Sequence, residues 1–216
     1  MLSNYYQNEF GNKYLELNPD KKANTQQLVN QLDDVGLALQ YDLIADNPNP
    51  LGSKDAMVEI SNATSYATHH RFYHPAYRQY LNEFGYYDIF IVDANSGHVV
   101  YSVFKELDFA TSLLNDSYAQ SGIADVFKAA LNLSENQTAV TDFAAYPPSY
   151  EAAASFIASP IIENGNKVAV LIFQMPADRI NEIVTYHEKW LVRGLGESGE
   201  TYLVGKDLRA MIISGV

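Results

Sequence analysis

The 216-residue sequence contains no cysteine. That absence excludes disulfides, thiolate metal sites and cysteine nucleophiles, and it suits an oxidising compartment. Basic residues are also scarce, because 14 Lys and Arg stand against 26 Asp and Glu and give a formal net charge of −12. Nucleic acid requires clustered lysine and arginine, so we expect no nucleic-acid partner, and adhesion to anionic lipid is equally disfavoured.

Long apolar runs are missing as well. No stretch reaches the about 18 apolar residues that suggest a bilayer-spanning helix. The first residues lack the basic start and apolar middle of a secretion signal. The chain opens on tyrosine-rich helical sequence and stops at MIISGV, just after a new strand begins. We therefore expect the protein to be either cytosolic or a fragment cut from between membrane spans, and these two features of its ends favour the fragment.

Apolar and aromatic residues, by contrast, are plentiful. Hydrophobic residues make up 47% of the chain, with 16 Tyr and 10 Phe, which is ample for a packed core. In the N-terminal third, Leu28, Leu32, Val35 and Leu39 recur at three- and four-residue steps, which predicts one buried helical stripe. Pro75 suits the first turn of a later helix that stops before a glycine at position 85.

After residue 85 the period changes to that of strands. YYDIFIVD and HVVYSVF flank the turn NSG, which predicts an antiparallel hairpin of Tyr87–Asp93 with His98–Phe104. A helix over 122–132, three strand-like segments and an amphipathic helix over 178–191 follow. This order predicts an α+β fold, with an antiparallel sheet of about five strands and long N-terminal helices packed alongside it.

Motifs for metal binding and catalysis are weak. His70 and His74 stand at i and i+4 but lack the glutamate of an HExxH motif, so we expect no metal site and place them at the solvent or the core boundary. No G-x-S-x-G elbow occurs, and nothing couples a particular serine to a histidine, so catalysis is unsupported and no cofactor is expected. A small hydrolase or isomerase that uses a cleft Asp or Glu stays an alternative.

Two loops are candidates for lining a ligand cleft. FKELDF leaves the second hairpin strand, and the YPPSY loop precedes a later strand, where sensing domains form clefts. Solvation is the default expectation for Glu106 and Asp108, and the aromatic residues could simply cap the core. A lysine beside tyrosines suits an anionic or polar small molecule. The predicted ligand-binding residues are Tyr101, Lys105, Asp108, Tyr146, Tyr150 and Ser155.

Several segments carry a family resemblance: YYDIFIVD, GHVVYSVFKELDFATSLL, SGIADVFKAA, DFAAYPPSYEAAASFIASPII and GLGESGETYLVGKD. Over Tyr86 to Asp207 the sequence resembles the extracytoplasmic sensor region of bacterial methyl-accepting chemotaxis proteins, of the Cache or PAS-like class. The resemblance implies a PAS-like sheet and a periplasmic, non-enzymatic domain of an inner-membrane chemoreceptor. Such a domain binds a small molecule and transmits a signal across the membrane, and we expect a homodimer in the full-length receptor.

The resemblance also divides the chain and leaves alternatives open. We expect a helical region over 1–84, a PAS-like/Cache sensor domain over 85–192, and a linker with the first strand of a candidate second module over 193–216. The tail LRAMIISGV departs from the family pattern, and the Arg-x-Trp-Tyr run of amino-acid-binding relatives is absent, so no amino acid ligand is implied. A histidine kinase or nucleotide cyclase carrying the same sensor fold, and a ligand-free structural module, are alternative interpretations.

Overall fold

The computed structural model describes residues 1–176, 180, 182–183, 202–204 and 210–212. A five-stranded sheet forms its centre, in the order β2-β1-β7-β6-β3, and all neighbouring strands are antiparallel. This confirms the predicted α+β fold with a sheet of about five strands. The strands are β1 (Asp88–Asp93), β2 (Val99–Ser102), β3 (Ala139–Val140), β6 (Phe156–Glu163) and β7 (Asn166–Gln174).

The predicted hairpin is confirmed in β1 and β2. Ile91 is paired with Tyr101, and a bulge follows Ile91. In the turn, the Asp93 carboxylate accepts the backbone N–H groups of residues 95 and 96, and Gly97 has a φ of +70°. A Cβ at Gly97 would lie 2.7 Å from the Cγ of Leu114, so the turn requires glycine for both its backbone angle and its space.

The N-terminal stripe is not one helix, which corrects the prediction. One helix ends at Asn30, and the next begins at Asp34 with the Asp33 side chain capping it through the Gly36 N–H at 2.7 Å. The restart changes the rotational phase, so Val35 is 64% exposed while Leu32 is buried. The N-terminal elements are α1 (Leu2–Tyr5), η1 (Tyr6–Phe10), α2 (Gly11–Leu17), α3 (Thr25–Asn30), α4 (Asp34–Gln40), η2 (Tyr41–Ala45) and η3 (Lys54–Ala56).

The long helix is α5 (Ser65–Phe84), and it runs through Pro75 instead of starting there. Thr64 caps it by accepting the Ala67 N–H, which begins the helix ten residues before the proline. At the other end Gly85 adopts a φ of +70° and donates its N–H to the Leu81 carbonyl. The predicted stop at residue 85 is therefore confirmed, and the predicted start is wrong.

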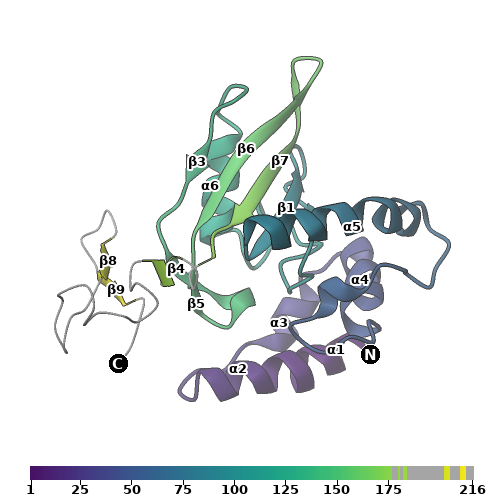
Figure 1. Cartoon of the computed structure of the whole chain (residues 1–216). Coiled ribbons are helices and arrows are strands. Elements are labelled where there is room, and N and C mark those ends of the chain that lie inside the picture. Colours follow the sequence, from purple (N-terminus) through teal and green to yellow (C-terminus); the bar gives the residue numbers. More distant parts are fainter. Residues whose placement is uncertain (177–179, 181, 184–201, 205–209, 213–216) are drawn as a thin grey trace.

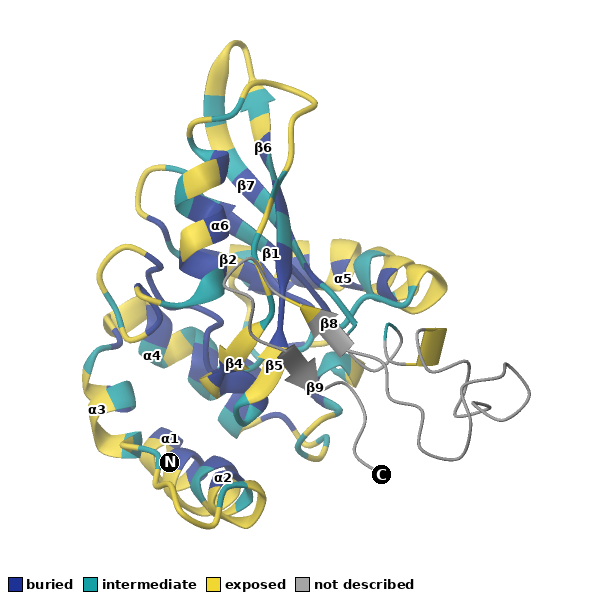
Figure 2. Ribbon diagram, turned by 90° about the vertical axis from the view of Figure 1, so that its left-hand side faces the viewer, coloured by how far each residue is buried: buried dark blue, intermediate teal, exposed yellow. Residues whose placement is uncertain are grey.

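The two faces of the sheet are covered by different helices. Helix α6 (Gly122–Ala130) packs on the face that carries Phe90 and Phe156, whereas α5 crosses the opposite face near Ile89. Figure 1 shows α5 beside β1, with helices α1–α4 grouped below it. Figure 2 shows the buried positions along β6, β7 and the inner side of α6.

Two shorter hairpins complete the described residues. One joins β4 (Ala144–Tyr146) and β5 (Ala152–Ala154) through η4 (Pro147–Ser149), and the other pairs β8 (Tyr202–Val204) with β9 (Ala210–Ile212). Most of the helix predicted over 178–191 and most of the segment 193–216 lie outside the described residues, so the domain boundaries stay predictions. Within the described residues, no helix combines the length and apolarity needed to cross a membrane.

Candidate ligand-binding cleft

A buried carboxylate on β1 shapes the loop that follows β2. Asp88 Oδ1 accepts the backbone N–H groups of Val103 and Phe104 at 2.9 and 3.1 Å, and its Oδ2 accepts the Ser102 hydroxyl at 2.7 Å. Burial raises the pKa of Asp88 to about 6, and these hydrogen bonds oppose the rise. Asp88 thus adds a side-chain acceptor where the chain turns away from the sheet, and the Val103 N–H also donates to the Ile89 carbonyl of β1 at 3.2 Å. Sequence reasoning did not identify Asp88.

Lys105 begins the loop in an unusual backbone conformation. Its φ is +59°, in the left-handed region, and Ala110 further along has a φ of +61°. A non-glycine residue in this region costs roughly 1–2 kcal/mol, and such strain concentrates at functional sites. The Lys105 N–H donates to the Ser102 hydroxyl oxygen at 2.9 Å, and the ammonium donates to the Ser102 carbonyl.

The Lys105 side chain is 2% exposed and lies against two aromatic rings. Its Nζ is 4.5 Å from the centroid of Tyr101 and 5.4 Å from that of Phe109. Burial lowers the pKa of Lys105 to about 7, although the charges of Asp88 and Asp55 act in the opposite direction. Among the described residues Lys105 forms no ion pair. An anion placed beside it would stabilise the charged ammonium.

A small cleft of about 70 Å³ adjoins this loop. Lys54, also buried, lines it together with Lys105; the Lys54 ammonium donates to the Asn47 carbonyl at 2.9 Å and lies 5.3 Å from the Tyr5 ring centroid. Burial lowers the pKa of Lys54. The volume suits a few water molecules or a ligand of a few heavy atoms. Aromatic walls surround the two cations, formed by Tyr5, Phe10, Tyr87, Phe104 and Tyr150.

Glu106 supplies the acidic side of the cleft. Its carboxylate accepts the Tyr87 hydroxyl at 3.0 Å and the Ser149 hydroxyl at 2.9 Å. Burial raises the pKa of Glu106, and the neighbouring charges of Asp108 and Asp88 raise it further. The cleft therefore offers two amines and one carboxyl group within an aromatic enclosure, which can recognise a small anion that also carries a hydrogen-bonding group.

The turn after β4 forms the facing rim. Tyr150 and Glu151 are consecutive left-handed residues, with φ of +56° and +65°. The Tyr150 ring stacks on Phe10 with centroids 5.1 Å apart, and Glu151 accepts the Tyr14 hydroxyl at 2.5 Å. Residues of the N-terminal helices thus fix the YPPSY loop over the cleft.

The six predicted ligand-binding residues fall into three groups. Lys105 and Tyr150 line the cleft, and Tyr101 lies beneath Lys105 on the α5 face. The other three residues, Tyr146, Asp108 and Ser155, do not line the cleft. The Tyr146 hydroxyl donates to Asp108 at 2.5 Å inside the core, and the Ser155 hydroxyl donates to the Thr141 carbonyl at 2.6 Å. Ligand contact by these six residues stays a prediction.

The default expectation of a solvated Asp108 is wrong. Asp108 is 0% exposed, and burial, followed by the charge of Asp88, raises its pKa to about 7. Its Oδ1 has no hydrogen-bond partner within the described part of the chain. The loop folds inward because Leu107 and Phe109 on either side are core residues, and they carry the carboxyl group with them.

The histidines are also buried, contrary to the expectation from sequence. The rings of His70 and His74 stack 4.3 Å apart. His74 Nε2 donates to the Asp55 carbonyl at 2.7 Å, which leaves Nδ1 to accept the Tyr101 hydroxyl at 2.7 Å. Burial lowers the pKa of His74 to about 4 and that of His70 to about 3. No group of metal-binding side chains occurs in the described ranges.

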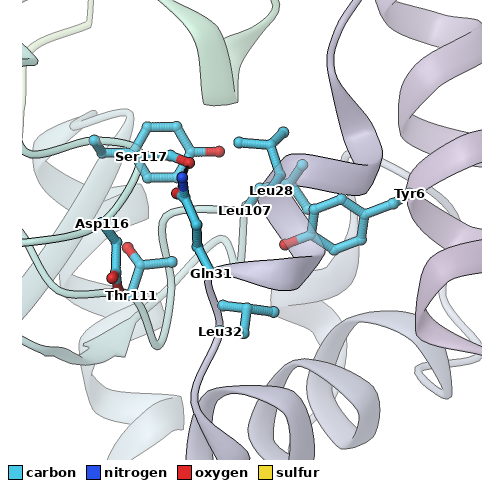
Figure 3. Close-up of a pocket in the computed structure, with 9 residues that line it drawn as sticks. Tyr6, Leu28, Gln31, Leu32, Leu107, Thr111, Asp116 and Ser117 are labelled. Carbon is cyan, nitrogen blue, oxygen red and sulfur yellow. Dashed lines mark hydrogen bonds between the residues drawn. The ribbon is translucent and has the colours of Figure 1, made fainter.

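Three other hollows among the described residues have no buried lysine or arginine in their lining. Figure 3 shows one where Tyr6, Leu28 and Leu32 approach Leu107, but its cavity volume is about 0 Å³. A larger groove of about 510 Å³ runs between α5 and the sheet and is almost wholly apolar. A third, of about 300 Å³, is lined by the exposed Lys22. The cleft at Lys105 is the candidate site because it combines enclosure with buried charge.

No protein-family model matches the chain, and no curated protein matches it. Among solved structures it is similar to the sensory domain of the Campylobacter jejuni chemoreceptor Tlp3 (CcmL), with 15% identity, 97% of this chain and 73% of that chain covered, and a TM-score of 0.43. The ligand-binding domain of Tlp3 in complex with 4-methylisoleucine has 13% identity, coverage of 95% and 71%, and a TM-score of 0.43.

The chain is also similar to the sensor domain of a histidine kinase, with a lower TM-score. The sensor domain of the Vibrio cholerae histidine kinase DctB has 16% identity, coverage of 82% of this chain and 56% of that chain, and a TM-score of 0.37. The chain therefore spans little more than half the length of that domain. All three of these solved structures are sensory or ligand-binding domains.

Proposed function

We propose that the chain is the periplasmic ligand-sensing domain of an inner-membrane chemoreceptor and binds a small anionic or polar molecule in the cleft at Lys105. The burial of Lys105 without an ion-pair partner among the described residues carries the proposal. A buried amine without a direct ion-pair partner gains from an anionic ligand, because the ligand supplies both a nearby charge and hydrogen bonds. The sequence motifs supply the receptor context.

The proposed mechanism is a shift between two conformations, with no bond made or broken. Lys54 of the cleft is adjacent to Asp55, whose carboxylate accepts Arg78 Nε at 2.7 Å and whose carbonyl accepts His74. Both partners lie on α5, so displacement of η3 by a ligand would move the long helix. In the full-length receptor a homodimer would carry this movement to the membrane.

A thermal-shift titration with formate, acetate, glycolate and phosphate, and with ethylamine as the cationic comparison, tests the proposal. An anion at a hundredfold excess over Kd should stabilise the fold by about 2.7 kcal/mol. For a chain of this size that raises Tm by roughly 5–10 °C. Lys105→Met should raise the Kd for the anion at least about tenfold, since a hydrogen bond to a charged group contributes about 1.5–3 kcal/mol.

Lys167→Met is the matched control, because Lys167 also donates to a backbone carbonyl, that of Leu131 at 2.7 Å, but lies outside the cleft. It should respond to the anion as the unaltered protein does. The proposal fails if none of the four anions raises Tm, or if Lys105→Met and Lys167→Met respond alike.

A further inference from the structure

Gln40, the last residue of α4, is 0% exposed and contacts the loop of residues 105–110. Its Nε2 donates to the Phe109 carbonyl at 2.6 Å and to the Leu107 carbonyl at 3.2 Å. No other hydrogen bond to either carbonyl is found within the described residues. One side-chain amide therefore satisfies two buried backbone acceptors of the loop.

The orientation of this amide is fixed by a second residue. The Tyr6 hydroxyl donates to Gln40 Oε1 at 2.5 Å, which requires the oxygen to face η1 and the nitrogen to face the loop. A flipped amide would place Oε1 against two carbonyl oxygens and leave the tyrosine hydroxyl without an acceptor at that end. Tyr6 and Gln40 thus form a directed chain of hydrogen bonds from the first helical turns to the loop.

The segment held by Gln40 lies between the two strained residues. Lys105 precedes it and Ala110 follows it, both with positive φ. Left-handed residues of this kind persist only where surrounding contacts over-determine the backbone. Without the two hydrogen bonds from Gln40, the segment would relax toward ordinary backbone angles and would move the Lys105 ammonium toward water.

We infer that Gln40 is a positioning residue for the cleft, oriented by Tyr6, and that it keeps the 105–110 loop folded inward so that the Lys105 amine stays buried beside the cleft. The link also joins the N-terminal helices to the loop. Its relevance to ligand binding rests on the proposed function, whereas its effect on Lys105 does not. An experiment can therefore contradict the proposed ligand binding and leave the positioning role of Gln40 intact, or the reverse.

The experiment follows Lys105 directly in the protein without ligand. In protein labelled with ¹³Cε-lysine, the Lys105 signal, assigned by its loss in Lys105→Arg, should titrate near pH 7 in the unaltered chain. Gln40→Met keeps the length and shape of the side chain but removes both donors. We expect its Lys105 titration to move toward the ordinary lysine value near 10.4. Amide hydrogen exchange over residues 105–110 should quicken at least about tenfold relative to β1 and β7.

Tyr6→Phe gives a milder test if Gln40→Met does not fold, because it removes only the hydroxyl that orients the amide. We expect faster exchange in the same loop, by a smaller factor. Tyr66→Phe is the control, since that hydroxyl donates to the Val100 carbonyl of β2 at 3.1 Å and not to a group of the loop. The inference is overturned if folded Gln40→Met keeps the Lys105 titration and the loop exchange of the unaltered chain. It is also overturned if Tyr6→Phe and Tyr66→Phe affect the loop equally.

Discussion

The two faces of the sheet bury ionisable groups of opposite kinds. On one face are His70 and His74, buried residues of α5, each held neutral by burial, which lowers the pKa of each ring. On the other face Asp88 and Asp108 are buried, and burial raises the pKa of both carboxyl groups. Lys105 lies between the two sets, at the edge strand β2. Both clusters are buried polar groups, but protonation has opposite effects on them.

Between about pH 4 and pH 7 the two clusters therefore change the stability of the fold in opposite directions. The histidines contribute stability that is present above their unfolded pKa near 6.5 and is lost as pH falls through their folded values, about 4 for His74. The carboxyl groups contribute stability that is present below about pH 3.8 and is lost as pH rises through about 6 for Asp88 and about 7 for Asp108. Falling pH therefore lowers the stability that the histidines of α5 contribute, and rising pH lowers the stability that Asp88 and Asp108 contribute.

The largest expected effect comes from Asp88→Ala. The change leaves the Phe104 N–H and the Ser102 hydroxyl without their buried acceptor, whereas the Val103 N–H keeps the Ile89 carbonyl. At about 1–3 kcal/mol for each unsatisfied group, partly relieved by water, we expect a loss on the order of 4 kcal/mol at pH 5. Urea unfolding measures it. A loss below about 1 kcal/mol would show that the carboxylate is dispensable for the loop.

The loss of stability as pH falls from 7 to 4 should depend on His74. From pH 7 to pH 4 a shift from 6.5 to about 4 removes on the order of 3 kcal/mol from the free energy of unfolding. His74→Phe lowers stability at pH 7, because the Tyr101 hydroxyl and the Asp55 carbonyl lose their partner, but it should flatten the dependence between pH 7 and pH 4. Urea titrations at pH steps test this. Parallel curves for the two proteins would contradict it.

The loss of stability as pH rises from 5 to 8 should depend on Asp108. Asp108→Asn replaces a carboxyl group that must lose its proton near pH 7 by an amide that stays neutral. We expect a change of about 1–2 kcal/mol in the variant's stability relative to the unaltered protein between pH 5 and pH 8, in the variant's favour as pH rises. The amide nitrogen must face away from the Tyr146 hydroxyl for this to hold. If the difference in stability between the two proteins stays constant from pH 5 to pH 8, ionisation of Asp108 does not cause the loss.

The smallest effect is expected at the open end of α5. Phe84 is 63% exposed, so Phe84→Ser should change the free energy of unfolding by less than about 0.5 kcal/mol. Its pH dependence should match that of the unaltered chain. A drop of more than about 2 kcal/mol would mean that another surface covers this aromatic residue in solution, and sedimentation at two concentrations would then test for a second copy.

The hairpin and the helix stop at Gly85 could be predicted because each depends on neighbours within a few residues. The NSG turn, the alternation in VVYS and the left-handed glycine are local signals. The single N-terminal stripe was predicted wrongly because the capping side chain of Asp33 outweighed the continuing period of apolar residues. Sequence reasoning also identified Lys105 and Tyr150, since both stand in loops next to strands.

The sequence alone therefore determined the sheet, its hairpin and the two loops beside the cleft, through short-range periodicity and turn chemistry. Only the tertiary structure decided which polar groups are buried. Lys54 joins Lys105 across 51 positions, and Gln40 reaches the Phe109 carbonyl across 69. No local pattern marks such partners. Burial withdraws water from a charge or an amide, and the resulting pKa shifts and hydrogen bonds exist only once distant segments have met.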